Sequence, residues 1–251
     1  MINPIVIFYT VLLQIRKFGK MDIFWHIIML ISAAGSASLG PDGIYGILGL
    51  ATNPAVLLIV AMRFTTDSYQ AGNEYYALLF SRPIRRFDYV LTKAFAGWLG
   101  TQFFVAKVVL MLMVMQLLFG ISPLILPGGL QLLSVSANAL SASCLSLLIC
   151  KLPEKLSSWA LLLITGSYLA GSASSASLKP EGILANVPMQ QGESLFAAIG
   201  TVFYPYLDLD ALFSATTFSF IPFLNYTSNI FIYLLIAAWL LSRQEFSYAN
   251  D

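Results

Sequence analysis

Charged residues are scarce in this chain: Asp, Glu, Lys and Arg make up 10% of its 251 residues, whereas hydrophobic residues make up 58%. A soluble domain carries about 25% charged residues. Together with a mean hydropathy of +0.80, this shortage excludes a soluble protein and indicates an integral membrane protein. The formal net charge is only +1, so the sequence gives no support to nucleic-acid binding.

Side chains that commonly carry chemistry are also few. The chain has one histidine, His26, and two cysteines, Cys144 and Cys150, which lack the spacing of a metal site or a disulfide framework. It contains no phosphate-binding loop of the GxxxxGK[ST] type, so it cannot hydrolyse ATP by the usual route. We therefore expect no catalytic site, no metal site and no cofactor bound by this chain.

Long apolar segments account for most of the sequence. Six of them approach the roughly 20 residues that a helix needs to cross a bilayer, and turn-forming sequences such as GPDG (residues 40–43) separate several of them. Within the second segment, Asn53–Pro54 predicts a kink. The sequence predicts an all-α integral membrane protein of a single transmembrane domain (residues 1–251), with spans over residues 23–39, 44–64, 94–119, 130–150, 156–178 and 220–241.

The basic residues favour one orientation of these spans. With the N-terminus in the cytoplasm, 11 of the 13 Lys and Arg residues fall on the inner side, Lys179 falls outside, and Lys107 lies within the third span. Such a bias is typical of cytoplasmic loops. An even number of spans then leaves both termini in the cytoplasm.

Two further segments are apolar but too short to span. Residues 4–20 begin with an apolar run and predict a helix in the cytoplasmic interface. Residues 179–219 are acidic and lie outside, and their middle (residues 194–207) predicts a re-entrant hairpin. The alternative for the latter is a loop that rests on the lipid headgroups through Phe203, Tyr204 and Tyr206.

The cytoplasmic segment over residues 67–93 combines a helical pattern with a cluster of arginines. Apolar residues recur at positions i, i+4, i+7 and i+8 from Ala71, and polar residues occupy another face, so a short amphipathic helix is predicted over residues 70–80. Pro83 ends this helix. The arginines are Arg82, Arg85 and Arg86.

This part of the chain, GNEYYALLFSRPIRRFDYVLTK (residues 72–93), resembles the permease subunits of type-2 ATP-binding cassette (ABC) exporters. The likeness lies in a short helix followed by Leu-Leu, Ser-Arg-Pro, a basic pair and a lysine that opens the next span; Thr92-Lys93 stands where Gly-Lys is usual. The layout of six spans, an interfacial N-terminal helix and a long segment before the last span is also similar.

The resemblance implies a function in a prokaryotic plasma membrane. Residues 70–80 would form the coupling helix on a separate ATPase subunit, which binds ATP and Mg²⁺, and two permease copies, identical or paralogous, would form the path. The residues placed at the ATPase contact are Gln70, Asn73, Glu74, Tyr75, Arg82, Pro83, Arg85 and Arg86. The arginines have an alternative role, because anionic lipid headgroups attract basic residues next to the membrane.

Four polar residues are candidates for lining a pathway: Lys107, Asp208, Asp210 and Asn53. Lys107 lies about 20 Å into the third span, where a charge needs water or a partner such as Asp208 or Asp210; the alternative is a side chain that extends to the interface. An ion-coupled secondary transporter or channel is the second interpretation of the chain. Small residues at 136–146 and 171–177 predict close helix contacts, either within the chain or between copies.

Overall fold

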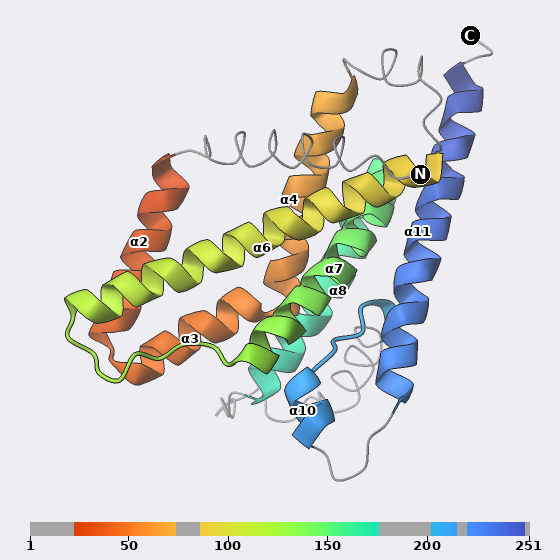
Figure 1. Ribbon diagram of the computed structural model, residues 1–251. Coiled ribbons are helices and arrows are strands. Elements are labelled where there is room, and N and C mark those ends of the chain that lie inside the picture. Colours follow the sequence, from red (N-terminus) through yellow and green to blue (C-terminus); the bar gives the residue numbers. More distant parts are fainter. Residues whose placement is uncertain (1–22, 74–85, 176–201, 215–219, 249–251) are drawn as a thin grey trace, which may run out of the picture.

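The computed structural model describes residues 23–73, 86–175, 202–214 and 220–248, and all regular structure within these ranges is helical. The all-α class predicted from the sequence is therefore confirmed for this part of the chain. The helices are α2 (Ile23–Ser38), α3 (Pro41–Thr52), α4 (Pro54–Asn73), α6 (Arg86–Leu118), α7 (Gly129–Lys151), α8 (Glu154–Ser175), α10 (Leu209–Ser214) and α11 (Ile221–Tyr248) (Figure 1).

Three of these helices are long and apolar enough to cross a membrane: residues Val90–Leu118 of α6, Gly129–Lys151 of α7 and Ile221–Leu240 of α11. The pair Pro41–Thr52 and Pro54–Thr65 makes a fourth if it is counted as one bent span. The apolar helices indicate a membrane protein. Six spans remain a prediction, since α2 has only 16 residues and the described part of α8 does not pass the same test.

The predicted break at Asn53–Pro54 is confirmed, because α3 and α4 meet there at an angle of 51°. Pro54 cannot donate a backbone hydrogen bond, so the helix cannot continue through it. Asn53 stabilises the new start: its side-chain Oδ1 accepts a hydrogen bond from the backbone N–H of Ala55 at 2.9 Å, and its own N–H bonds to the Leu50 carbonyl at 3.1 Å. The second predicted span is thus two helices with an ordered joint.

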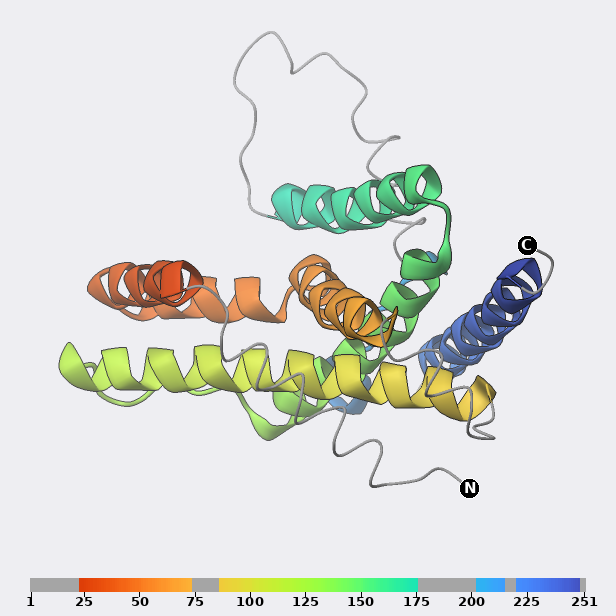
Figure 2. The same ribbon diagram turned by 90° about the horizontal axis from the view of Figure 1, so that it is seen from above.

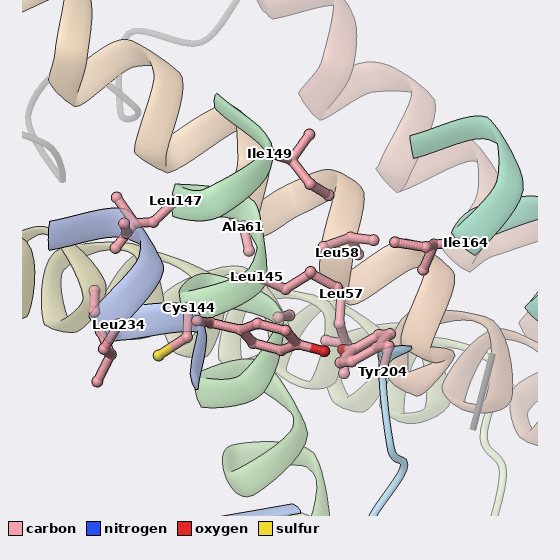
Figure 3. Packing of buried hydrophobic residues seen from close by; sticks show 14 of the residues in the cluster. Leu57, Leu58, Ala61, Cys144, Leu145, Leu147, Ile149, Ile164, Tyr204 and Leu234 are labelled. Atoms are coloured by element: carbon pink, nitrogen blue, oxygen red, sulfur yellow. The ribbon is translucent and has the colours of Figure 1, made fainter. Parts of the chain in front are cut away.

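Helix α7 lies at the centre of the molecule. It packs against α4, α6, α8, α10 and α11, and two thirds of its apolar span is buried inside the protein. The main apolar cluster gathers around it, with Leu57 and Leu58 from α4, Leu145 and Leu147 from α7, and residues of α6, α8 and α11 (Figure 3).

The α2–α3 hairpin forms a second, smaller region. It covers the later part of α6, on the side away from α11 (Figure 2). Its own cluster contains Ala33, Ala51, Val108 and Leu112. The connection between α6 and α7 is fixed to α6 by Gln116, whose buried carboxamide pairs with both the N–H and the carbonyl of Ile125, at 2.6 and 3.0 Å.

The two ends of the molecule differ in which connections they carry. The end of α4, the start of α6, and the ends of α7 and α11 lie at one end, and the starts of α7 and α11 and helix α10 lie at the other (Figure 1). Arg86 begins α6 and Lys151 ends α7, so these two basic residues occur at the same end. This agrees with the grouping expected from the charge pattern, while the side of the membrane that this end faces stays a prediction.

Candidate functional site

The feature that most resembles a built site is a polar contact zone between α7, α11 and the segment before α10. Residues 202–209, which we call the strap, run from two helical residues through the irregular residues 204–208 to the start of α10. An irregular backbone exposes N–H and C=O groups that a membrane interior cannot satisfy, so they need partners within the protein. The strap finds these partners on two helices.

Asn138 of α7 is the central partner of the strap. Its carboxamide donates from Nδ2 to the Leu207 carbonyl at 3.0 Å and accepts at Oδ1 from the Leu207 N–H at 2.9 Å. Its own backbone carbonyl accepts a hydrogen bond from the Tyr204 hydroxyl at 3.1 Å. Asn138 and Tyr204 are both 0% exposed, so these hydrogen bonds are shielded from solvent and lipid.

A second residue of α7 holds the beginning of α10. The Ser134 hydroxyl, one helical turn before Asn138, accepts a hydrogen bond from the Leu209 N–H at 2.9 Å. Ser134 is 3% exposed. Ser134 and Asn138 therefore satisfy consecutive parts of the strap from one face of α7.

Helix α11 holds the other part of the strap. The Asn229 carboxamide donates to the Val202 carbonyl at 2.8 Å, and the Tyr233 hydroxyl donates to the Phe203 carbonyl. Tyr226, on the same helix, donates to the Ala137 carbonyl of α7 at 2.6 Å. These three residues are spaced at i, i+3 and i+7 and so share one face of α11.

The strap belongs to the segment for which the sequence left two alternatives, and both remain predictions. Tyr204, predicted to rest on lipid headgroups in one of them, is buried and belongs to the main apolar cluster, which also contains Leu57 and Ile164 (Figure 3). Asn138 lies nine residues after the start of α7, which is about 14 Å along the helix. The strap is thus bonded well along a buried helix, and the re-entrant hairpin over residues 194–207 stays a prediction, since residues 176–201 lie outside the described part. Phe203 and Tyr206 are exposed.

The predicted pathway residues lie on different elements, and their role stays a prediction. Lys107 is half-buried on α6, Asp208 is exposed in the strap, and Asn53 caps α4. Among the described side chains, no ion pair joins Lys107 to Asp208; the side chain of Asp210, on α10, lies outside them. Within the described residues, no group of His, Cys, Asp and Glu could hold a metal ion.

The predicted coupling segment is described only at its two ends. Helix α4 continues without a break to Asn73, so Gln70 and Asn73 lie in its last turns and not in a separate helix. Arg86 is the first residue of α6. The remaining residues predicted at the ATPase contact, Glu74, Tyr75, Arg82, Pro83 and Arg85, lie outside the described residues.

The small residues predicted over 136–146 pack inside the chain. Ser143 donates to the Ala94 carbonyl of α6 at 2.6 Å, and the Thr65 hydroxyl of α4 lies 3.1 Å from that of Ser146. A Cβ atom added to Gly97 would overlap the Ser143 side chain, and one added to Gly100 would lie 2.5 Å from the Phe64 ring. Of the two alternatives for residues 136–146, these contacts favour close helix packing within one chain over a contact between copies.

No role was predicted from the sequence for five residues that hold the strap or join α11 to α7: Asn138, Ser134, Asn229, Tyr226 and Tyr233. A signal for the first was present, because a carboxamide in the middle of an apolar span is costly unless it has a partner. The three α11 residues were also recognisable as a polar stripe on one helix face. In comparisons with known proteins, neither the protein-family models nor the curated proteins give a match to this chain.

Proposed function

We propose that this chain is the transmembrane permease subunit of a type-2 ABC exporter in a prokaryotic plasma membrane, with both termini in the cytoplasm. Separate ATPase subunits bind ATP and Mg²⁺ and drive the transport cycle, and a second permease copy, identical or paralogous, completes the path. The observation that carries this proposal is the stretch GNEYYALLFSRPIRRFDYVLTK, which runs from the last residues of α4 to the first turns of α6.

The packing of α4 and α6 supports a mechanical role for this connection. The two helices flank residues 74–85, and both pack against α7. Gly97 of α6 lies close to Ser143 of α7, and Gly100 of α6 lies close to Phe64 of α4. A force applied between α4 and α6 therefore acts directly on the two helices that surround the central one. Because α4 is one continuous helix up to Asn73, a force on residues 70–73 displaces the whole of α4.

In this mechanism, ATP-driven closure of the ATPase subunits pushes on residues 70–80 and shifts α4 and α6 relative to α7. The joint at Asn53 allows α3 to change its angle without unwinding α4, since each helix keeps its own hydrogen bonds there. The path then opens alternately to the two sides of the membrane. Arg82, Arg85 and Arg86 flank the ATPase contact and also attract anionic lipid headgroups.

The test is purification of the tagged chain from its native membrane, to find whether an ABC-type ATPase co-purifies, followed by reconstitution of the complex into vesicles. We expect a stoichiometric complex whose ATP hydrolysis changes when the permease is present. Asn73→Leu combined with Glu74→Leu should remove this effect while membrane insertion stays normal. Leu162→Phe, on the exposed face of α8, is the matched control; equal behaviour of the two variants would reject the coupling role.

Lys107 favours a second candidate, an ion-coupled secondary transporter or channel, because a lysine within a membrane helix is a functional candidate by default. This candidate predicts flux in vesicles that contain only an ion gradient and no ATP. Lys107→Gln should abolish that flux. Transport that requires the ATPase and persists in Lys107→Gln would reject it.

A further inference from the structure

The strap is held in two parts by two different helices. Its first part, Val202 and Phe203, accepts hydrogen bonds at its two backbone carbonyls from Asn229 and Tyr233 of α11. Its second part, residues 204–209, is bonded to α7 through Ser134 and Asn138. The change of partner falls between Phe203 and Tyr204.

The two parts differ in how strongly they are held. Four hydrogen bonds join the second part to α7, and Tyr204 and Leu207 are 0% and 3% exposed. Two bonds join the first part to α11, and Val202 and Phe203 are 59% and 53% exposed. The Asn229 bond is exposed and the Tyr233 bond is partly buried, whereas three of the four bonds of the second part are buried. Hydrogen bonds that water reaches open at lower free energy than buried ones.

Helix α11 is also attached to the rest of the protein in two ways. Its later residues Leu234 and Ala237 belong to the main apolar cluster, together with Cys144 and Leu147 of α7 (Figure 3). Among the described residues, 221–229 of α11 contribute no side chain to that cluster; there Tyr226 and Asn229 form hydrogen bonds to α7 and to the strap, and Tyr233, itself a member of the cluster, bonds to Phe203. The beginning of α11 is therefore held by fewer apolar contacts than its later part.

We propose that the strap is a two-part latch for the first half of α11. When this half of α11 moves away from α7, the bonds from Tyr226, Asn229 and Tyr233 break, and residues 204–209 stay on α7, held by Asn138 and Ser134. Asn138 is thus the residue that keeps the fixed half of the latch in place. The inference concerns the fold alone and does not depend on the proposed transport function.

Hydrogen–deuterium exchange on the full chain in nanodiscs tests the fixed half. The Leu207 and Leu209 amides are bonded to Asn138 and Ser134, so their exchange reports only on that half. Asn138→Ala should raise exchange at Leu207 at least tenfold. A triple variant of α11 (Tyr226→Phe, Asn229→Ala, Tyr233→Phe) should change it by less than twofold. If Asn138→Ala does not fold, Ser134→Ala with the Leu209 amide makes the same comparison.

Distance measurements between spin labels test the moving half. Labels at Leu133→Cys and Leu224→Cys, both exposed positions, report on the starts of α7 and α11 in a background with Cys144→Ala and Cys150→Ala. The triple variant should gain a population at longer distance. Thr227→Val, which removes only a hydrogen bond within α11, should not.

Two outcomes would overturn the latch. In the first, the triple variant raises Leu207 exchange as much as Asn138→Ala does, which means that the strap opens as one unit. In the second, the triple variant leaves the distance between the labels unchanged, which means that these bonds do not retain α11. Both readouts are structural, so a failure of the transport proposal would leave them interpretable.

Discussion

The surroundings of α7 and the α2–α3 hairpin are held together by different forces. Around α7, buried polar side chains bond across elements, as Asn138 does to Leu207 and Ser143 to Ala94. In the hairpin, every side-chain hydrogen bond described for α2 and α3 stays within its own helix, such as Ser36 to Ser32 and Thr52 to Leu48. The hairpin is therefore attached to α6 mainly by contacts between small and apolar side chains of the second cluster.

This difference matters because lipid tails are as apolar as leucine. Between helices in a membrane, burial of apolar surface gives little driving force, so close packing and interhelical hydrogen bonds decide how helices associate. Directional bonds fix the position of one element on another, whereas apolar contacts tolerate sliding. The hydrogen bonds around α7 therefore fix the relative positions of the elements more strictly than the apolar contacts of the hairpin do.

The largest expected effect comes from removing the central partner of the strap. Asn138→Ala leaves the N–H and C=O of Leu207 without partners at a position that is 3% exposed. Unsatisfied buried groups cost about 1–3 kcal/mol each, so the free energy of unfolding should fall by about 2–4 kcal/mol. Asn229→Ala, whose partner carbonyl is exposed, should cost less than ~1 kcal/mol. Equal losses in a denaturation series in detergent would contradict the ranking.

A methyl group added at a helix crossing should give the next largest effect. In Gly97→Ala the new Cβ overlaps Ser143 and lies 2.9 Å from Thr65 Cγ2, so we expect a loss of about 1–3 kcal/mol from overpacking. Gly49→Ala in α3, where no atom lies within 4 Å of the new Cβ, should be neutral or stabilise by up to ~1 kcal/mol through helix propensity. Thermal unfolding of both variants measures this difference in stability. An equal loss of stability in Gly49→Ala and Gly97→Ala would contradict the prediction.

Two serine substitutions compare the hydrogen bonds of the regions directly. Ser143→Ala removes a bond to another helix and should cost about 0.6 kcal/mol, the average for such bonds in a membrane protein. Ser36→Ala removes a bond within α2 and should have almost no effect, since a serine that bonds to its own helix slightly destabilises it. The unfolding midpoints of the two variants should differ in this order, and the reverse order would argue against the distinction.

The smallest expected effect is a dependence on alkaline pH that arises in the strap. Burial raises the pKa of Tyr206 above its usual value of 10.0, and the negative charge of Asp208 raises it further. Folding thus favours the neutral phenol, so its contribution to stability is present below pH 10 and is lost as the pH rises above it. The melting temperature of the wild type should fall slightly more between pH 9 and pH 11 than that of Tyr206→Phe. Asp208→Asn should reduce the difference, and an identical pH dependence of all three would contradict the assignment.

Local patterns in the sequence predicted much of the helical structure. The spans expected over 130–150 and 220–241 correspond to α7 and α11, and the proline after Asn53 correctly marked a bend. Helix α6 begins at Arg86, eight residues before the span predicted from Ala94, because a helix can extend beyond its apolar part into the polar residues that precede it. Hydrophobic composition locates the apolar part of a helix, but backbone hydrogen bonds and caps determine its end residues, so the two boundaries can differ.

The strap was not predictable in the same way. Asn138 and Leu207 are 69 residues apart in the chain, and no local pattern reports a contact between a side chain and a distant backbone group. The small residues around Asn138 indicated close packing, but they did not say whether another helix or another copy would fill the space. The coupling residues Glu74 to Arg85 remain predictions from the sequence.

The enclosure of α7 limits how this chain can assemble. Helix α7 packs against α4, α6, α8, α10 and α11, and two thirds of its apolar span is buried, so the surface that it could offer to a neighbouring molecule lies mainly in its first turn, where Leu132 and Leu133 are exposed. If two copies assemble, their contact would therefore be made mostly by the outer helices, and a path between them would be lined by residues that are exposed in a single chain. The buried part of α7 would then support such a path from the side and would not line it.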